Sequence, residues 1–189
     1  MMKRSLDIIF ALIAGVVFII PCLLIALLIK TTSIGPTLYI SKRVGRHGKL
    51  FYMPKFRTMH VETPELATDK LGDPTDYLTP IGSFLRTTSL DELPQIISVL
   101  LGHMSLVGPR PALFNQNDLI AHRQELGINN LRPGITGWAQ VCQGYAYDID
   151  SSSKKITYDL FYIKNLSFLL DMTIIMRTIR ILLTGFGSR

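Results

Sequence analysis

An uncharged apolar run near the N-terminus is the feature that most constrains this chain. No charged residue occurs from position 8 to position 29. A helix rises about 1.5 Å per residue, so one of this length is long enough to cross a hydrocarbon layer of about 30 Å. No small-x-small cleavage site follows the run, which argues against a cleaved signal peptide. The first thirty residues therefore predict a membrane-inserted segment.

Two topologies are open for this segment. Lys3 and Arg4 precede the run and Lys30 follows it, so the positive-inside rule gives no direction. Pro21 lies within the run, where it removes a helix hydrogen bond and favours a kink, and each arm alone is too short to span. From these residues alone, a spanning helix and a re-entrant helix that returns to the same face are equally predicted.

The rest of the chain predicts an α+β fold, a mainly helical globular domain with a small β-hairpin element. Turn signals between short β-branched stretches at 33–52 favour one or two hairpins. Helix signals are more numerous, and a Gly-rich stretch at 132–144 reads as irregular. The expected helices run from Pro80 to Arg86, from Asp91 to Leu101 with Gly102 closing it, from Asn115 to Leu126 with Gly127 closing it, and, as one or two helices, from Tyr158 to Leu183.

The net charge and the cysteine content limit the kinds of binding partner and the cellular compartment that we expect for this protein. The formal net charge of +6 favours acidic partners such as lipid headgroups or phosphates, and nucleic acid is not expected because no nucleic-acid-binding motif accompanies the charge. Two cysteines give no disulfide framework, which suits a cytosolic location for the catalytic part. Arg177 and Arg180 lie in an apolar helix, which is either a core helix or one in the headgroup layer, and we favour the second.

The central chemical candidate is the acidic pair Asp91 and Glu92, followed by Pro94. Pro94 fixes a helix start close upstream, so Asp91 is a plausible N-cap, and Ser89-x-x-Glu92 also matches a capping box. The alternative is a nucleophile for a pyrophosphate. A carboxylate about 4 Å from two phosphate charges meets about 8 kcal/mol of repulsion at an effective dielectric of about 20, so such a site needs cations.

Basic residues in short, conformationally defined segments could supply those cations. Lys55 and Arg57 share one side of an extended strand if their alternation holds. Arg110 lies between two prolines, which reduces the entropy lost on binding an anion. Arg132 precedes another proline, and Arg86 lies just before the acidic pair. Each could equally be a solvated surface charge.

Several motifs in the same order resemble the bacterial sugar transferase family, the monotopic phosphoglycosyl transferases. The resemblance covers nearly the whole chain and begins with Lys3, Arg4 and Asp7 before the apolar run. It continues through KFRTM (55–59), TSLDELPQ (88–95), MSLVGPRP (104–111), RPGITGWAQV (132–141), YIKN (162–165) and Asp171.

The resemblance implies an enzyme that transfers a sugar 1-phosphate from a UDP-sugar to polyprenol phosphate, usually undecaprenyl phosphate, and releases UMP. Asp91 would be the nucleophile of a covalent intermediate, and Glu92 would help to hold Mg²⁺ with Asp91 or prepare the lipid phosphate. Arg110 would bind the donor phosphate, and Lys55, Arg57, Arg86 and Arg132 are further candidates for substrate charge. Such enzymes start glycoconjugate assembly, for example of O-antigen, capsule, exopolysaccharide or glycoprotein glycans.

The family also implies a location on the bacterial inner membrane, with the catalytic domain on its cytoplasmic face. Residues 1–32 would form a re-entrant helix, and residues 33–189 would form the cytosolic catalytic domain with interfacial helices and anionic lipid neighbours. Family members often have serine before the kinking proline, whereas Ile20 stands here, which leaves the depth and angle of the helix open.

Two other functions are open on sequence, a membrane-bound nucleotide-sugar hydrolase and a non-catalytic membrane-binding module. Residues 142–153 are a candidate for sugar choice, but the sequence reveals neither the sugar nor the oligomeric state.

Overall fold

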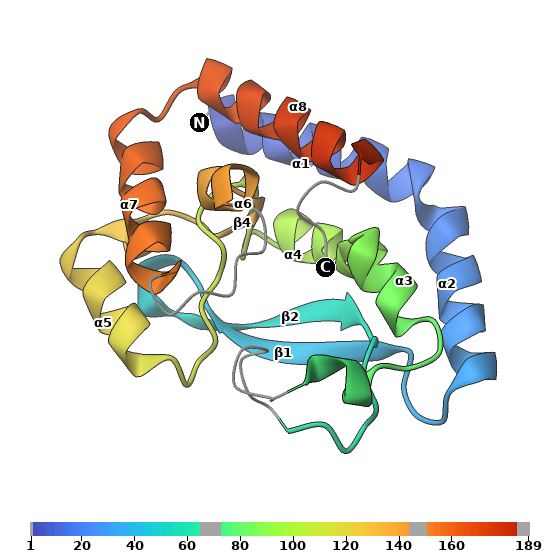
Figure 1. Cartoon of the computed structure of the whole chain (residues 1–189). Coiled ribbons are helices and arrows are strands. Elements are labelled where there is room, and N and C mark those ends of the chain that lie inside the picture. The colour runs from blue at the N-terminus through green and yellow to red at the C-terminus, as the bar shows by residue number, and fades with distance from the viewer. Residues whose placement is uncertain (1, 65–72, 144–150, 185–189) are drawn as a thin grey trace.

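The computed structural model describes residues 2–64, 73–143 and 151–184. A β-hairpin lies at one side, helices cover the other sides, and α1 and α8 run along the opposite edge (Figure 1). The predicted mixture of helices with small sheets is confirmed.

The strands are β1 (Leu38–Val44), β2 (Leu50–Phe56), β3 (Ser105–Val107) and β4 (Gly134–Thr136). The helices are α1 (Met2–Val17), α2 (Ile19–Thr32), α3 (Gly82–Thr87), α4 (Gln95–Leu100), α5 (Asn117–Glu125), α6 (Trp138–Gln143), α7 (Ser151–Lys164) and α8 (Phe168–Thr184). Short 3₁₀ turns are η1 (Arg46–Gly48), η3 (Pro74–Tyr77), η4 (Leu90–Glu92) and η5 (Ile128–Asn130).

The apolar N-terminal run forms two helices with a bend of 58° between them. The break lies at Phe18, between α1 and α2. Pro21 stands in the first turn of α2, where it cannot donate to the carbonyl of Val17, so the predicted kink occurs one turn before the proline. Among the described residues, no single helix passes as a membrane span, whereas the bent pair passes together on length and composition.

The first helix is also part of the globular body. Ala11 is fully buried in a core cluster with Phe51, Met53, Val99 and Met104. Near its start, the Lys3 ammonium contacts an Asp171 oxygen of α8 at 2.5 Å. Farther along, an Asp7 carboxylate oxygen accepts hydrogen bonds from the Ser105 hydroxyl and the Leu106 amide of β3. The packing of α1 is therefore continuous with the core that carries β2, α4 and β3.

The expected hairpin is confirmed as β1 and β2, which pair antiparallel from Leu38 opposite Phe56 to Val44 opposite Leu50. His47 and Gly48 adopt positive φ values of 57° and 72° in the turn that joins the strands. One face of the hairpin packs on α4 and α1 through Phe51 and Met53. The second strand continues to Phe56, so that Lys55 near its end lies close to η4.

A short parallel pair, β3 with β4, was not expected from the sequence. Ser105 lies opposite Gly134, and Val107 lies opposite Thr136. The prediction that 132–144 is irregular is wrong, because this stretch contains β4 and α6. Strands of three residues carry too little alternation to be recognised, and their pairing joins segments about 30 positions apart.

Glycines allow the backbone of β4 to lie against the turn after β3. A Cβ atom on Gly134 would stand 2.1 Å from the Gly108 nitrogen and 2.4 Å from the Thr136 oxygen. Both are backbone atoms, so a rotamer change cannot relieve the contact. The position of the Gly108–Arg110 turn thus depends on the absence of a side chain at Gly134.

Gly134→Ala is expected to destabilise the protein by about 3 kcal/mol, because overpacking against backbone must move β4 away from the Gly108 turn. The thermal midpoint should fall by roughly 10 °C in a chain of this length. Gly15→Ala is the matched control, since its Cβ would meet only Ile96 Cγ2, at 4.0 Å, and alanine favours the helix. Equal midpoints for Gly134→Ala and the wild type would contradict this account.

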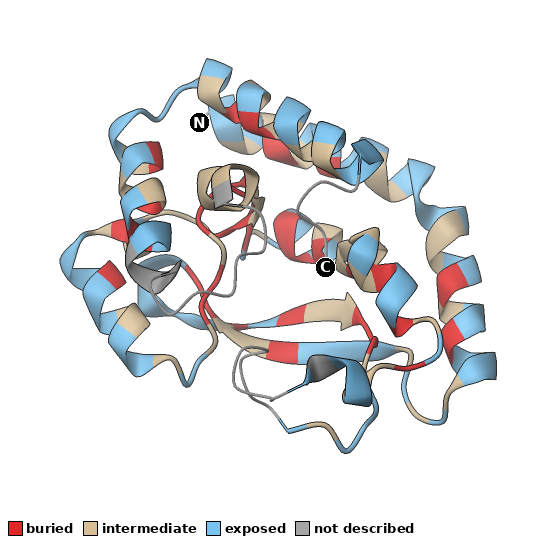
Figure 2. Ribbon diagram, viewed as in Figure 1, coloured by how far each residue is buried: buried red, intermediate tan, exposed pale blue. Residues whose placement is uncertain are grey.

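The C-terminal region forms two helices, α7 and α8, which resolves the prediction of one or two. Only Asp171 and Ile174 of α8 are buried, and most of its surface is exposed (Figure 2). The Arg177 guanidinium lies 4.9 Å from the centre of the Trp138 ring, which stacks on Phe161. The helix is therefore no fully buried core helix, and Arg177 is engaged with an aromatic ring of α6.

Candidate active site

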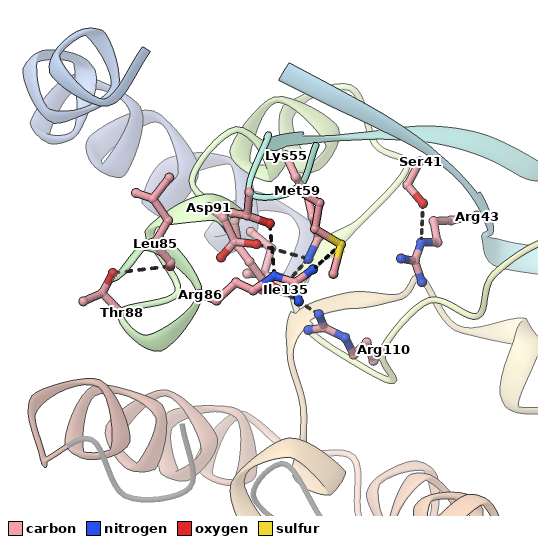
Figure 3. Close-up of polar contacts among 12 residues, drawn as sticks. Ser41, Arg43, Lys55, Met59, Leu85, Arg86, Thr88, Asp91, Arg110 and Ile135 are labelled. Carbon is pink, nitrogen blue, oxygen red and sulfur yellow. Dashed lines mark hydrogen bonds and ion pairs between the residues drawn. The ribbon is translucent and has the colours of Figure 1, made fainter. Parts of the chain in front are cut away.

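The acidic pair lies in η4, between α3 and α4, and faces the end of β2. Ser89, just before this turn, has a φ of 55°, a left-handed conformation that is unfavourable for a residue with a side chain. The turn brings Asp91 and Glu92 toward Lys55 on β2 (Figure 3). The strained backbone at Ser89 thus directly precedes two largely buried carboxylates.

The helix-capping interpretation of the pair is wrong. Ser89 makes no side-chain capping hydrogen bond, and the residue that caps α4 is Pro94 rather than Asp91. The helix expected from Asp91 to Leu101 instead begins at Gln95, after the separate turn η4. The side chain of Glu92 accepts hydrogen bonds from Lys55 and Arg110 and does not turn back to its own backbone.

Three cations surround the pair. The Lys55 Nζ atom lies 2.8 Å from Glu92 Oε1 and 3.7 Å from an Asp91 oxygen. An Arg110 Nη2 atom, from the loop after β3, lies 2.6 Å from the same Glu92 oxygen. Arg86 of α3 donates to the Thr58 hydroxyl and contacts the Met59 sulfur, and its charge also acts on Asp91. Among the described residues, Glu92 is therefore paired with two close cations, whereas Asp91 is paired with Lys55 alone, at a longer distance.

This asymmetry separates the pKa values of the two carboxyls. Burial raises the pKa of Asp91, and the positive charges of Lys55, Arg110 and Arg86 offset that effect only in part. Burial also acts on Glu92, but there the charges and hydrogen bonds of Arg110 and Lys55 outweigh it and hold the pKa well below its usual range. Glu92 is thus ionised throughout the physiological range, and Asp91 is the carboxyl whose charge responds to its surroundings.

The acid limb of the kcat/KM profile is expected to follow Asp91 if its carboxylate is the reacting group. Because the pKa of Asp91 is raised, activity should fall on acidification at a pH above the ordinary aspartate value of about 3.9. Lys55→Met should move this limb to higher pH, because the Lys55 charge lowers the pKa of Asp91. A pH–rate profile measures both, and a limb that Lys55→Met shifts to lower pH would contradict the assignment.

Two of the predicted substrate-binding residues lie away from the pair. Arg57 is the first residue beyond β2, and its guanidinium donates to the Ser33 and Ile34 carbonyls after α2. Its guanidinium is therefore held by the chain after α2 rather than by the acidic pair. Arg132 donates to the Gly102 carbonyl, at the far end of α4 from the pair. The structure brings together Lys55, Arg86 and Arg110, and it holds Arg57 and Arg132 elsewhere.

Sequence reasoning missed Arg43, a partly buried arginine of β1, as a residue of this site (Figure 3). Its Nε donates to the Ser41 hydroxyl at 2.9 Å, and its Nη1 donates to the Pro111 carbonyl at 3.3 Å. Burial, together with the charge of Arg110, lowers its pKa to about 10, while Glu92 acts in the opposite direction. The sequence gives no signal for this position, because the contacts of Arg43 with Pro111 and Leu113, which bring it beside Arg110, join distant segments.

The backbone of Arg110 is held by a second, deeper ion pair that the sequence did not indicate. Arg123 of α5 and Asp159 of α7 are both buried, and their nitrogen and oxygen lie 2.6 Å apart. The other terminal nitrogen of Arg123 donates to the Arg110 carbonyl at 2.7 Å. Burial raises the pKa of Asp159, although the charge and hydrogen bond of Arg123 oppose this. Two helices therefore fix the loop that carries Arg110.

The acidic pair offers carboxylate oxygens to a divalent cation. Among the residues that the structure describes, no group of three or more His, Cys, Asp or Glu side chains could hold a metal ion. Mg²⁺ commonly uses one or two carboxylates together with water and substrate phosphates, and the oxygen ligands of Asp91 and Glu92 suit it. The pair therefore fits a magnesium ion that takes its remaining ligands from a phosphorylated substrate. Of the segment considered for sugar choice, residues 144–150 lie outside the described residues.

Comparison with known proteins gives consistent matches. The family model described as bacterial sugar transferase matches residues 1–185. A UDP-N-acetylgalactosamine-undecaprenyl-phosphate N-acetylgalactosaminephosphotransferase of Aeromonas hydrophila is 41% identical, and the alignment covers 99% of this chain and 45% of the relative. UDP-glucose:undecaprenyl-phosphate glucose-1-phosphate transferases of Xanthomonas campestris pv. campestris and Caulobacter vibrioides are 44% and 39% identical. These alignments cover 82% and 96% of this chain, and 33% and 70% of the relatives, so the chain spans less than half of the first two proteins.

Proposed function

This chain belongs to the bacterial sugar transferase family, and we propose that it transfers a sugar 1-phosphate from a UDP-sugar to undecaprenyl phosphate and releases UMP. The observation that carries the proposal is the largely buried Asp91–Glu92 pair among Lys55, Arg86 and Arg110. The relatives named above act on UDP-sugars and undecaprenyl phosphate, which supports the same substrate classes here. The reaction would initiate the assembly of a membrane-bound glycoconjugate.

The proposed reaction has two displacements. An Asp91 carboxylate oxygen attacks the phosphorus that bears the sugar, and the bond from that phosphorus to the bridging oxygen breaks, so that UMP leaves. A phosphate oxygen of the polyprenol phosphate then attacks the same phosphorus and breaks its bond to Asp91. The products are polyprenol diphosphate sugar and a regenerated carboxylate. Asp91 suits the nucleophilic role because it is less tightly paired than Glu92.

The cations have distinct roles in this proposal. Lys55 contacts both carboxylates, so it can hold Asp91 in place and compensate part of the charge that two phosphates bring. Arg110 is ordered by Glu92 and by its own fixed backbone, and it would bind the donor phosphate. Arg43 adds positive charge beside Arg110. Glu92 thus arranges Lys55 and Arg110 for substrate.

Magnesium is part of the proposal, with Asp91 and Glu92 as its protein ligands. When bound, the ion would neutralise charge on the phosphate oxygens and so favour attack at phosphorus.

We also propose the membrane arrangement. Residues 1–32 would form a re-entrant helix in the bacterial inner membrane, and residues 33–189 would form the catalytic domain on the cytoplasmic face. The bend of 58° between α1 and α2 supports this arrangement, as do the exposed apolar side chains on α8, among them Leu169, Met176 and Leu183. Interfacial helices of this kind would place the acidic pair within reach of a lipid phosphate.

The decisive experiment measures UMP release by the full chain in undecaprenyl phosphate micelles with a panel of UDP-sugars that includes UDP-N-acetylgalactosamine and UDP-glucose. Release that requires both substrates supports the transferase. UMP release without the lipid would instead identify a nucleotide-sugar hydrolase, and lipid binding without turnover would identify a binding module. Incubation with UDP-sugar alone followed by intact-mass measurement tests the covalent step, since the adduct adds the mass of one sugar phosphate.

A further inference from the structure

A second cluster of positive charge lies at the end of α4 that is remote from Asp91 and Glu92. It consists of Arg4, Arg46 and Arg132, hereafter the arginine cluster. Each guanidinium is anchored on a backbone carbonyl of one of two neighbouring turns, 99–102 and 128–130. Arg4 also lies against Gly102, the residue whose carbonyl accepts from Arg132. Three cations are therefore held side by side by the backbone.

Among the described residues, no acidic side chain forms a close ion pair with the arginine cluster. None of its three members takes part in an ion pair within the described part of the chain. Arg46 and Arg132 each use Nε for the backbone, and their terminal nitrogens have no hydrogen-bond partner among the described residues. Burial and the charges of Arg4 and Arg46 lower the pKa of Arg132, and the charge of Asp7 opposes this only in part. Fixed guanidinium groups with unused terminal nitrogens are suited to bind a phosphate.

An apolar hollow adjoins the arginine cluster. It has a volume of about 420 Å³ and lies between β1, β2 and α4. Leu50, Tyr52, Ile97 and Leu101 are among its lining residues, and each is more than half exposed. Large apolar side chains gathered on an open surface indicate a binding site for an apolar group.

The hollow and the arginine cluster share two chain segments. Leu101 directly precedes Gly102, which holds Arg132, and Leu50 follows the hairpin turn that contains Arg46. A ligand that fills both must carry a phosphate at one end and a hydrocarbon chain at the other.

We propose that the arginine cluster and the hollow together bind one anionic phospholipid, with its phosphate on the arginines and an acyl chain in the hollow. Arg4 supports a lipid rather than a soluble phosphate, because it lies in the first turn of α1, the first half of the bent apolar helix pair. The phosphate end of this site is separate from the Asp91–Glu92 pair, because Arg4 and Arg132 bind carbonyls at the C-terminal end of α4, whereas the pair precedes its N-terminal end. The bound lipid is a structural ligand and is not consumed.

Native mass spectrometry of the delipidated full chain in non-ionic detergent tests the proposal. Dioleoyl phosphatidylglycerol should bind at one site at least about tenfold more tightly than dioleoyl phosphatidylcholine. Arg46→Gln should weaken this binding about fivefold and Arg46→Gln/Arg132→Gln about 25-fold, at about fivefold for each basic residue. Leu101→Ser should also weaken it, because an exposed apolar contact is lost. Lys164→Gln on α7 removes one positive charge elsewhere and should leave binding unchanged.

Three results would overturn the proposal. Binding of phosphatidylglycerol by Arg46→Gln/Arg132→Gln at wild-type strength would show that the arginines do not hold the phosphate. Equal affinity for sn-glycerol 3-phosphate would show a site for soluble phosphate. Displacement by an equal concentration of undecaprenyl phosphate would assign the site to acceptor capture. Thermal midpoints measured without lipid establish that each variant is folded. If the double variant is not folded, the single variant Arg46→Gln tests the role of the arginines. No UDP-sugar is present, so the outcome is independent of the proposed transferase activity.

Discussion

Asp91→Asn is expected to lower the rate of UMP release by at least about 10³-fold, because the amide cannot replace the proposed nucleophile. The same substitution is expected to raise the thermal midpoint at pH 7. The pKa of Asp91 is raised in the folded protein, so its contribution to stability is present below its unfolded pKa and is lost as the pH rises through the folded value. A neutral side chain removes the cost of burying that charge.

Glu92→Gln is the matched control, because it should change stability in the opposite direction. The pKa of Glu92 is lowered on folding, so its carboxylate stabilises the protein above its unfolded pKa, and this stabilisation is lost as the pH falls through the folded value. At pH 7 the glutamine variant should therefore have a lower midpoint and leave Lys55 and Arg110 without their shared partner. Full UMP release by Asp91→Asn, or a fall in its midpoint, would contradict the account of this pair.

The largest expected effect on stability is that of Asp159→Asn. This substitution leaves the buried Arg123 guanidinium without its counter-charge, and loss of one partner of a buried pair costs about 3–5 kcal/mol. The thermal midpoint should fall by roughly 10 °C. Arg123→Met should cost less, because the remaining Asp159 has a raised pKa and can be protonated, whereas a guanidinium cannot lose its charge.

Lys3→Met is the matched control for this comparison, since it breaks an ion pair in which the lysine side chain is 43% exposed. It should cost less than about 1 kcal/mol. Thermal unfolding of the four proteins, including the wild type, measures these differences. A larger loss in Arg123→Met than in Asp159→Asn would contradict the explanation by burial and charge.

The elements that the sequence predicts well are those with a local signal. Gly127 ends α5 with a φ of 71°, and Gly102 follows α4 with a φ of 86°, as expected for glycines after helices. The hairpin follows from alternation and turn residues, and the bend follows from Pro21. Each of these depends on neighbours within a few positions of the chain.

The parts that sequence reasoning missed depend on contacts between distant segments. The pairing of β3 with β4 joins two runs of three residues, which are too short for a periodic pattern. Lys55 and Arg57 are two positions apart, but their partners come from different distant segments. Lys55 reaches Glu92, whereas Arg57 binds the chain after α2.

The capping interpretation failed for a related reason. A capping box is a local pattern, and Ser89 to Glu92 satisfies it in sequence. The competing partners, Lys55 and Arg110, are 37 and 18 positions from Glu92, and their charges attract the carboxylate more strongly than a neutral backbone amide. In the sequence, only the ordered set of family motifs indicated a catalytic role for the pair.

The burial of Ala11 within the core has a practical consequence for anyone who wants a water-soluble version of this protein. Deleting α1 would uncover Met53 and Met104, remove the carboxylate that binds the amide of Leu106, and leave Asp171 without its lysine. A truncated fragment is therefore expected to be poorly folded and prone to aggregate. Solubilisation should instead replace outward-facing side chains of the first two helices, such as Val16 and Leu23, and leave the inward-facing Ala11 and Ile29 unchanged.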